Sequence, residues 1–315
     1  MCVSATDRIR LRLRAGPQRN GPLAVAVLVA ALGVAVAVVG ATVDSRTITG
    51  APAWLKPLKF ALSITFYCAT VQWMLRYVQD RPRLTRICAW LTTVALLGEL
   101  FLVDLQAYRG TTSHFNISTR FDASVLAVMA ALVVIVFGTA VVLAFVLLRQ
   151  PHLPGWFAAG LQGGLFVCLL GMLEAVLMIA HHGHTVGAPD GSPGLLLIGW
   201  SSQHGDLRIA HFTGLHALQV LPTAAWLIQR RLGPNRLRRA TRLVRLLSIT
   251  YAGTVILLAW QAERGESLQH PSETVTWVAL TWTAAALSVA LCTSFPIRPA
   301  ARRPPPTRGR VETLR

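Results

Sequence analysis

The stretch PLAVAVLVAALGVAVAVVGATV occupies residues 22–43 and contains no ionisable side chain. About 20 consecutive apolar residues are enough for an α-helix to cross the hydrocarbon core of a bilayer. The stretch is therefore expected to be a membrane-spanning helix. Apolar segments of similar length follow it, so the sequence predicts an all-α, polytopic integral membrane bundle of about eight transmembrane helices. The other seven spans are expected at 56–78, 87–108, 123–148, 156–181, 209–228, 243–260 and 274–295.

The composition also indicates an integral membrane protein. Of the 315 residues, 53% are hydrophobic and only 14% are charged, whereas soluble domains carry about 25% charged residues. The formal net charge of +17 is of the kind found in nucleic-acid-binding proteins. However, the arginines lie in short loops between apolar segments, where the orientation of a membrane protein places them. We therefore expect a lipid bilayer as the partner and no nucleic acid.

The distribution of basic residues predicts the orientation in the membrane. Most of the 30 Lys and Arg residues fall in the tails and alternate loops, which are cytoplasmic if both termini are cytoplasmic. Three regions are expected: a basic tail at 1–21, a transmembrane domain at 22–295 and a disordered Arg/Pro-rich tail at 296–315. The five cysteines are scattered without a CxxC pair, so neither a disulfide framework nor a thiolate metal site is indicated.

The segment GDLRIAHFTGLHALQ, residues 205–219, places an acid, a base and two histidines at the entrance of one apolar span. Ionisable groups inside a membrane are costly and commonly mark functional sites. In the predicted orientation, polar side chains of other spans and loops fall at the same extracytoplasmic level. The candidate ligand-binding residues are Lys56, Lys59, Glu99, Asp104, Arg109, His114, Glu174, His181, Asp206, Arg208, His211, His216 and Gln219.

Two interpretations of this set stay open. The groups can hydrogen-bond to one another and fix helix packing, or they can line a site for a ligand. Lys56 and Lys59 are the only lysines of the chain. Their flexible stems and compact charges suit an anionic or carboxylate partner, but also an extended position at the membrane interface.

Helical spacing assigns different positions to the residues of segment 205–219. His216 and Gln219 are three residues apart and share a helix face, so we expect them to line the cavity. His211, together with Asp206 and Arg208, is expected to form its rim.

Segment 184–194, HTVGAPDGSPG, together with segment 205–219, resembles a bacterial family of multi-span membrane proteins. Segments 54–59 and 109–122 belong to the same pattern. The resemblance covers most of the chain except the tails. It implies a multi-pass protein of the bacterial plasma membrane and brings no activity with it.

Three functions compete. The first is binding or transport of a small molecule or lipid headgroup, because carboxylates and histidines at this depth suit such roles. The second is a haem- or metal-binding membrane oxidoreductase, since eight spans with outer histidines resemble the layout of haem A synthases. His181 with His211 or His216 are the candidate haem ligands. The third is a metal-dependent hydrolase that uses His114 and Asp206 with the histidines of segment 205–219, although no HExxH spacing is present.

Overall fold

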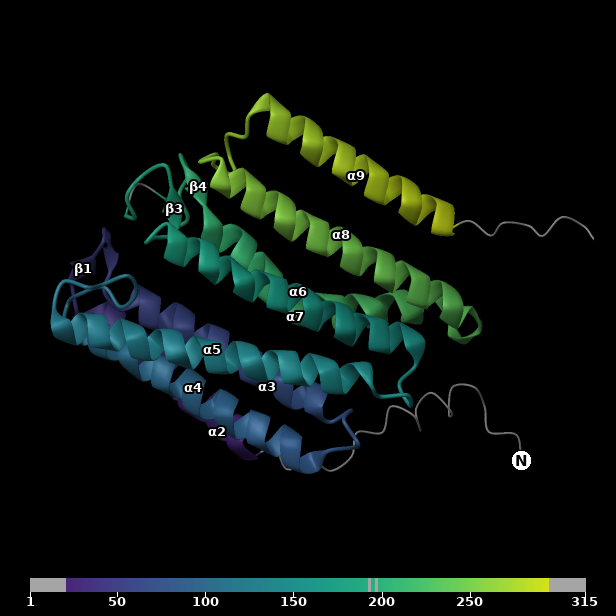
Figure 1. The fold of residues 1–315 in the computed structure, drawn as a ribbon, viewed down its shortest axis with the longest axis horizontal. Coiled ribbons are helices and arrows are strands. Elements are labelled where there is room, and N and C mark those ends of the chain that lie inside the picture. Colours follow the sequence, from purple (N-terminus) through teal and green to yellow (C-terminus); the bar gives the residue numbers. More distant parts are fainter. Residues whose placement is uncertain (1–20, 192–193, 196–197, 295–315) are drawn as a thin grey trace, which may run out of the picture.

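The computed structural model describes residues 21–294 except 192–193 and 196–197. The expected tail at 296–315, and all but the last residue of the expected tail at 1–21, lie outside the described residues. The described chain is all-α apart from two pairs of very short strands (Figure 1). Its eight long helices are α2 (Gly21–Val43), α3 (Leu55–Leu75), α4 (Pro82–Tyr108), α5 (Arg120–Leu148), α6 (Gly155–Ala180), α7 (Leu207–Leu232), α8 (Leu237–Glu263) and α9 (Glu273–Ser294).

Seven of these helices in the described part of the chain are long and apolar enough to cross a membrane. Helix α7 is the exception, because it carries Arg208 and Arg230–Arg231 as well as two histidines. It nevertheless lies antiparallel to α6 and alongside α8 over the same length (Figure 1). The predicted all-α, polytopic bundle is therefore confirmed, with α7 as a more polar helix packed between two apolar ones.

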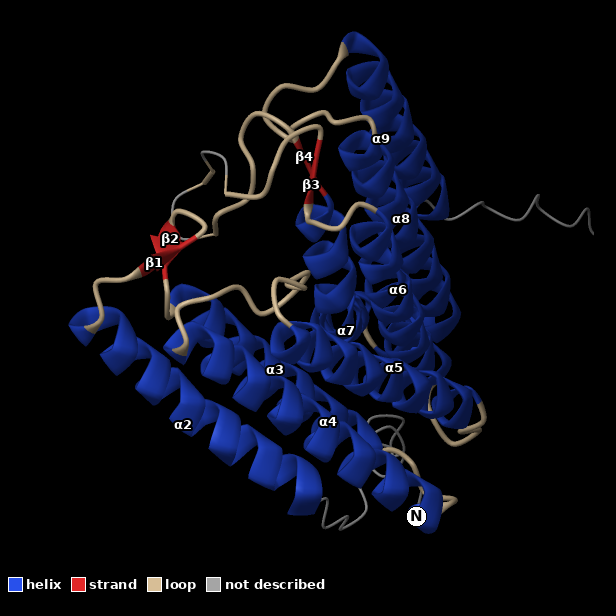
Figure 2. Ribbon diagram, turned by 60° about the vertical axis from the view of Figure 1, so that its left-hand side comes forward, coloured by secondary structure: helices blue, strands red, loops and turns tan. Residues whose placement is uncertain are grey.

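The helices form two groups of four. Helices α2–α5 pack against one another, as do α6–α9, and the two groups are inclined to each other (Figure 2). Helix α5 contacts α6 and so connects the groups. At the end of the bundle where α3 ends and α6 begins, Phe157 packs edge-on against Trp73 and Tyr77, with ring centroids 5.9 and 4.9 Å apart. This aromatic cluster joins the two groups at that end.

Helices α6 and α7 approach each other closely through glycines. A Cβ atom on Gly171 would lie 2.7 Å from the Cα atom of Gly214, and one on Gly160 would lie 2.7 Å from the Cβ atom of Ala225. Small residues at such positions let membrane helices approach closely, and van der Waals packing then holds them together. The polar helix α7 is thereby fixed against α6, with one face removed from lipid.

Four loops meet at the opposite end of the bundle from the aromatic cluster. Strands β1 (Thr47–Ile48) and β2 (Ala51–Pro52) form a hairpin, and β3 (Thr185–Val186) pairs with β4 (Gly205–Asp206). The β3–β4 register places Thr185 opposite Asp206. We call this the strand-bearing end. Among the described residues, the other end carries most of the arginines, in or beside the turns between α3 and α4, α5 and α6, and α7 and α8.

The predicted spans match the helices, but several helices are longer than the apolar segments. The basic residues between the expected spans 209–228 and 243–260 are mostly helical and do not form a long loop, because only the short turn around 233–236 separates α7 from α8. Arginine has a high helix propensity, so a helix continues beyond the apolar segment that the hydropathy pattern marks.

The Gly171–Gly214 contact can be tested by substitution. We expect Gly171→Ala to lower the thermal unfolding midpoint in detergent, because the added methyl group meets backbone atoms of α7. Overpacking of this kind typically costs about 1–3 kcal/mol. Gly138→Ala on α5 is the matched control, because a Cβ atom there meets nothing within 4 Å. Equal midpoints for the two variants would contradict the close approach.

Candidate functional site

The loop between α4 and α5 brings a histidine to a buried carboxylate. Nε2 of His114 lies 3.3 Å from Oε1 of Glu99, and its Nδ1 lies 3.1 Å from the Ser113 hydroxyl. Glu99, on α4, is only 4% exposed. The His114 contact lacks hydrogen-bond geometry, and neither Glu99 oxygen has a hydrogen-bond partner among the described residues. This carboxylate is therefore available to a further partner.

Lys56, at the start of α3, is the cation whose charge acts on the Glu99 carboxylate. The charge of Glu99 acts on the Lys56 ammonium, which lies 5.9 Å from the centre of the Phe60 ring. The same ring lies 5.5 Å from the His114 imidazole. Within the described residues, the Lys56 ammonium makes no hydrogen bond to another group. An ammonium and a carboxylate thus face the same region, and both retain free hydrogen-bonding capacity.

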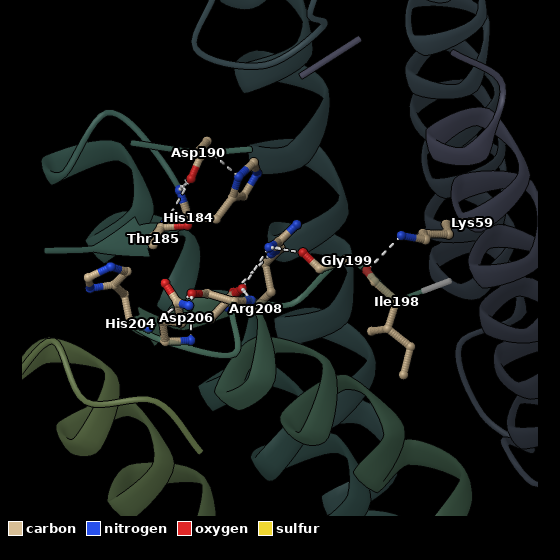
Figure 3. A network of polar contacts seen from close by, with 11 residues as sticks. Lys59, His184, Thr185, Asp190, Ile198, Gly199, His204, Asp206 and Arg208 are labelled. Carbon is tan, nitrogen blue, oxygen red and sulfur yellow. Dashed lines mark hydrogen bonds and ion pairs between the residues drawn. The ribbon is translucent and has the colours of Figure 1, made fainter. Parts of the chain in front are cut away.

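A second histidine is held by a carboxylate in the loop between α6 and α7. Nδ1 of His184 lies 2.7 Å from Oδ2 of Asp190, and the backbone N–H groups of His184 and Thr185 also donate to this carboxylate (Figure 3). Burial alone would raise the pKa of Asp190, but these hydrogen bonds and the His184 charge hold it well below its ordinary value. The His184 ring is therefore fixed through one nitrogen.

His211, on α7, is held in a similar way by the backbone of α6. Its Nδ1 lies 2.7 Å from the carbonyl oxygen of Gly171. If this nitrogen donates, the neutral ring presents Nε2 as an acceptor. His184 and His211 thus both have Nδ1 engaged, and neither Nε2 atom has a hydrogen-bond partner in the described part of the chain.

These groups form one electrostatic cluster, although they come from both halves of the bundle. Burial lowers the pKa of His114 well below its ordinary value, and the positive charges of Lys56 and of the His184 and His211 rings when these are protonated lower it further. His114 is therefore neutral at pH 7. We call Lys56, Glu99, His114, His184 and His211 the central cluster.

The loop before α7 crosses from one half of the bundle to the other. The Lys59 ammonium on α3 donates to the carbonyl oxygen of Ile198 at 2.7 Å (Figure 3). The adjacent carbonyl, of Gly199, accepts from the Arg208 guanidinium at 2.6 Å. Asp206 in turn binds Arg208 and accepts from the backbone N–H of Ser201. Lys59, Asp206 and Arg208 thus fix the loop.

Phe115, in the loop between α4 and α5, packs beside the rings of His114 and His184 and was not predicted. Its backbone is left-handed, with φ of 59°, which is rare for an aromatic residue and indicates local strain. The ring lies 5.2 Å from that of His184 and packs on the apolar group formed by Met178, Leu207 and Ala262. No sequence signal marks this role, because it depends on a loop of one half reaching the other half.

Other predicted residues lie away from the central cluster. Arg109 binds Gln106 and Asp122 at the start of α5. His181 pairs with Glu263 on α8, Glu174 is buried on α6, and Asp104 is half-buried on α4. His216 is exposed on α7. Gln219, which was expected to line a cavity with His216, instead donates to the Thr70 hydroxyl at 3.1 Å.

The described residues contain no group of three or more His, Cys, Asp or Glu side chains arranged to hold a metal ion. Comparisons with protein-family models, with curated proteins and with solved structures found no match for this chain. The resemblance inferred from the sequence therefore stands only as a multi-span helical membrane layout. A function proposed for this chain therefore rests on the geometry of the site.

The pKa of His114 leads to a prediction about pH. Because its folded-state pKa lies below the unfolded value of about 6.5, the unfolded chain takes up the proton first as the pH falls. Stability is full above about pH 6.5 and falls with acidification, by at most about 1.4 kcal/mol per pH unit. We expect thermal unfolding of the His114→Gln variant to show a shallower loss between about pH 7 and pH 5.5. His270→Gln, at an exposed loop position, should keep the wild-type slope. Identical slopes for wild type and His114→Gln would contradict the burial of a neutral imidazole.

Proposed function

We propose that this polytopic membrane protein binds, or moves across the membrane, a small molecule or lipid headgroup at the central cluster. The observation that carries the proposal is the buried Glu99 carboxylate, which has no hydrogen-bond partner among the described residues while the Lys56 ammonium faces the same region. Leaving both groups unsatisfied inside a membrane is costly, and a ligand that binds both would remove that cost.

The chemistry of the cluster favours a zwitterionic ligand. A phosphate or carboxylate group would bind to Lys56, and an ammonium group would bind to Glu99. The free Nε2 atoms of His184 and His211 would supply further hydrogen bonds. Phosphoethanolamine has both charges, either as the headgroup of a lipid or as a free molecule.

We further infer that the central cluster faces the extracytoplasmic side of a bacterial plasma membrane. The arginine-rich turns lie at the opposite end of the bundle, and the positive-inside rule assigns that end to the cytoplasm. In this orientation the ligand reaches the cluster from outside the cell or from the outer leaflet.

Thermal stabilisation tests the proposed ligand. The purified full chain in detergent should gain stability with phosphoethanolamine or with phosphatidylethanolamine, by about 2.7 kcal/mol at a hundredfold excess over the dissociation constant. We expect Lys56→Met and Glu99→Gln to lose this gain. Arg264→Ala removes a cation of a separate surface pair and should respond like the wild type.

The outcomes separate the sources of the ligand. Stabilisation by the lipid alone would identify a headgroup site, whereas stabilisation by the free molecule as well would identify a site for soluble ligands. Phosphatidylglycerol, which has no ammonium group, should give a smaller effect. No stabilisation of the wild-type protein by either ethanolamine compound would overturn the proposal.

One observation favours haem binding as a second candidate. Metal-ligating histidines usually donate their other ring N–H group to a carboxylate or a backbone carbonyl. His184 and His211 have this arrangement, through Asp190 and Gly171 respectively. They replace the pairs expected from the sequence, because His181 binds Glu263 and His216 is exposed. A haem between them would supply electron transfer.

A visible spectrum of the purified protein distinguishes the two candidates. If His184 and His211 hold haem, the wild type has a Soret band, and His211→Ala loses it while His216→Ala keeps it. The small-molecule proposal predicts a colourless wild-type protein. A Soret band that survives in both His184→Ala and His211→Ala would exclude this pair as the ligands.

A further inference from the structure

A second buried carboxyl group lies in the other half of the bundle, outside the central cluster. Glu174, on α6, is only 6% exposed, and its Oε2 atom has no hydrogen-bond partner among the described residues. A charged acidic side chain at the centre of a membrane costs at least about 2.5–3.5 kcal/mol on insertion scales. The group must therefore be neutral in the resting fold, or it must have a partner that can reach it.

An exposed acid–histidine pair lies beyond Glu174 at the strand-bearing end. Nε2 of His181 lies 3.1 Å from both carboxylate oxygens of Glu263, the last residue of α8. About a third of each side chain is exposed, at 36% and 34%. His181 follows Glu174 by seven residues, so both lie on the same face of α6. The pair therefore lies on the Glu174 face of α6, at the exposed end of that helix.

The charged groups that face Glu174 come from the helices packed against α6. Glu263, on α8, is the charged group whose field acts on Glu174. From α7, His211 binds the carbonyl oxygen of Gly171, one turn before Glu174. Helix α5 has no ionisable residue between Asp122 and Arg149. No cation from these helices neutralises Glu174. The Glu263 carboxylate repels the charged form of Glu174.

We propose that Glu174 is a proton-binding group that exchanges with water at the strand-bearing end through the His181–Glu263 pair. The pair takes a proton from a hydronium ion and leaves a water molecule, the N–H or O–H bond of the pair then breaks, and an O–H bond forms on the Glu174 carboxylate. One proton enters and the charge of one carboxylate is removed, so no further reactant is needed. Chains of Asp, Glu and His side chains inside membrane bundles form proton relays of this kind.

Infrared spectroscopy of the full chain in lipid nanodiscs tests this inference. A protonated carboxyl group has a carbonyl stretching band that the ionised form lacks. We expect such a band in the wild type at about pH 6, where a glutamate with the ordinary pKa of about 4.3 is already ionised, and we expect Glu174→Gln to lose it. Glu99→Gln should retain the component due to Glu174, which separates this site from the central cluster. Glu174→Asp, which keeps the carboxyl group, should retain a band at a shifted frequency.

The role of the surface pair is tested by the rate and pH dependence of that band. Glu263→Gln and His181→Ala should shift the pH at which the Glu174 band disappears, and should slow its response to a pH jump severalfold. Glu266→Gln, which changes a nearby loop acid paired with Arg264, should leave both unchanged. A band that persists in Glu174→Gln would overturn the proton site. If Glu263→Gln and His181→Ala both kept the wild-type rate and pH midpoint of the Glu174 band, the proposed proton path through the pair would be overturned.

Discussion

A polar group inside a bilayer must find its partner within the protein, because lipid tails offer no hydrogen bonds. This constraint decides where the charges of the chain lie. Asp206 is fully satisfied by Arg208 and by the backbone of the crossing loop, and Asp122 is satisfied at the start of α5. Among the buried carboxylates of the described residues, Glu99 and Glu174 are the exceptions. Both are buried, and both retain oxygen atoms without a hydrogen-bond partner in the described part of the chain.

The close approach of α6 and α7 makes this arrangement possible. Without side chains at Gly171 and Gly214, the two backbones meet, and the Gly171 carbonyl comes within reach of the His211 ring. The face of α7 that is buried in the bundle is mainly small and apolar, with Ala210, Gly214 and Ala217 among its residues, whereas His216 is exposed. The two halves of the bundle are inclined to each other. The loop before α7 connects them, because its backbone carbonyls bind Lys59 of one half and Arg208 of the other (Figures 2 and 3).

The spans could be predicted because an apolar run of membrane length nearly always forms a spanning helix. The helix ends could not, because they contain arginines, and the hydropathy pattern does not show how far the helix continues into them. The sequence also identified α7 as the polar helix with His211 at its entrance. It could not identify the exposed position of His216, which follows Gly214 by two residues and so points about 200° away from the α6 contact. The His184–Asp190 pair and the contact of the Phe115 ring with His184 were beyond sequence reasoning, because the first depends on the fold of one loop and the second on how loops from different halves meet.

The helix contact that positions His211 also lies next to Glu174. His211 belongs to the central cluster together with Glu99, and Glu174 follows Gly171 by one turn, where the charge of Glu263 on α8 acts on it. Because the Gly171–Gly214 contact has no side chain that could absorb a displacement, a shift of α7 along α6 would have to move the His211 ring and the surroundings of Glu174 together. Ligand binding at the central cluster and protonation of Glu174 would then be linked through α7, and such a linkage is reciprocal: each event would change the free energy of the other by the same amount.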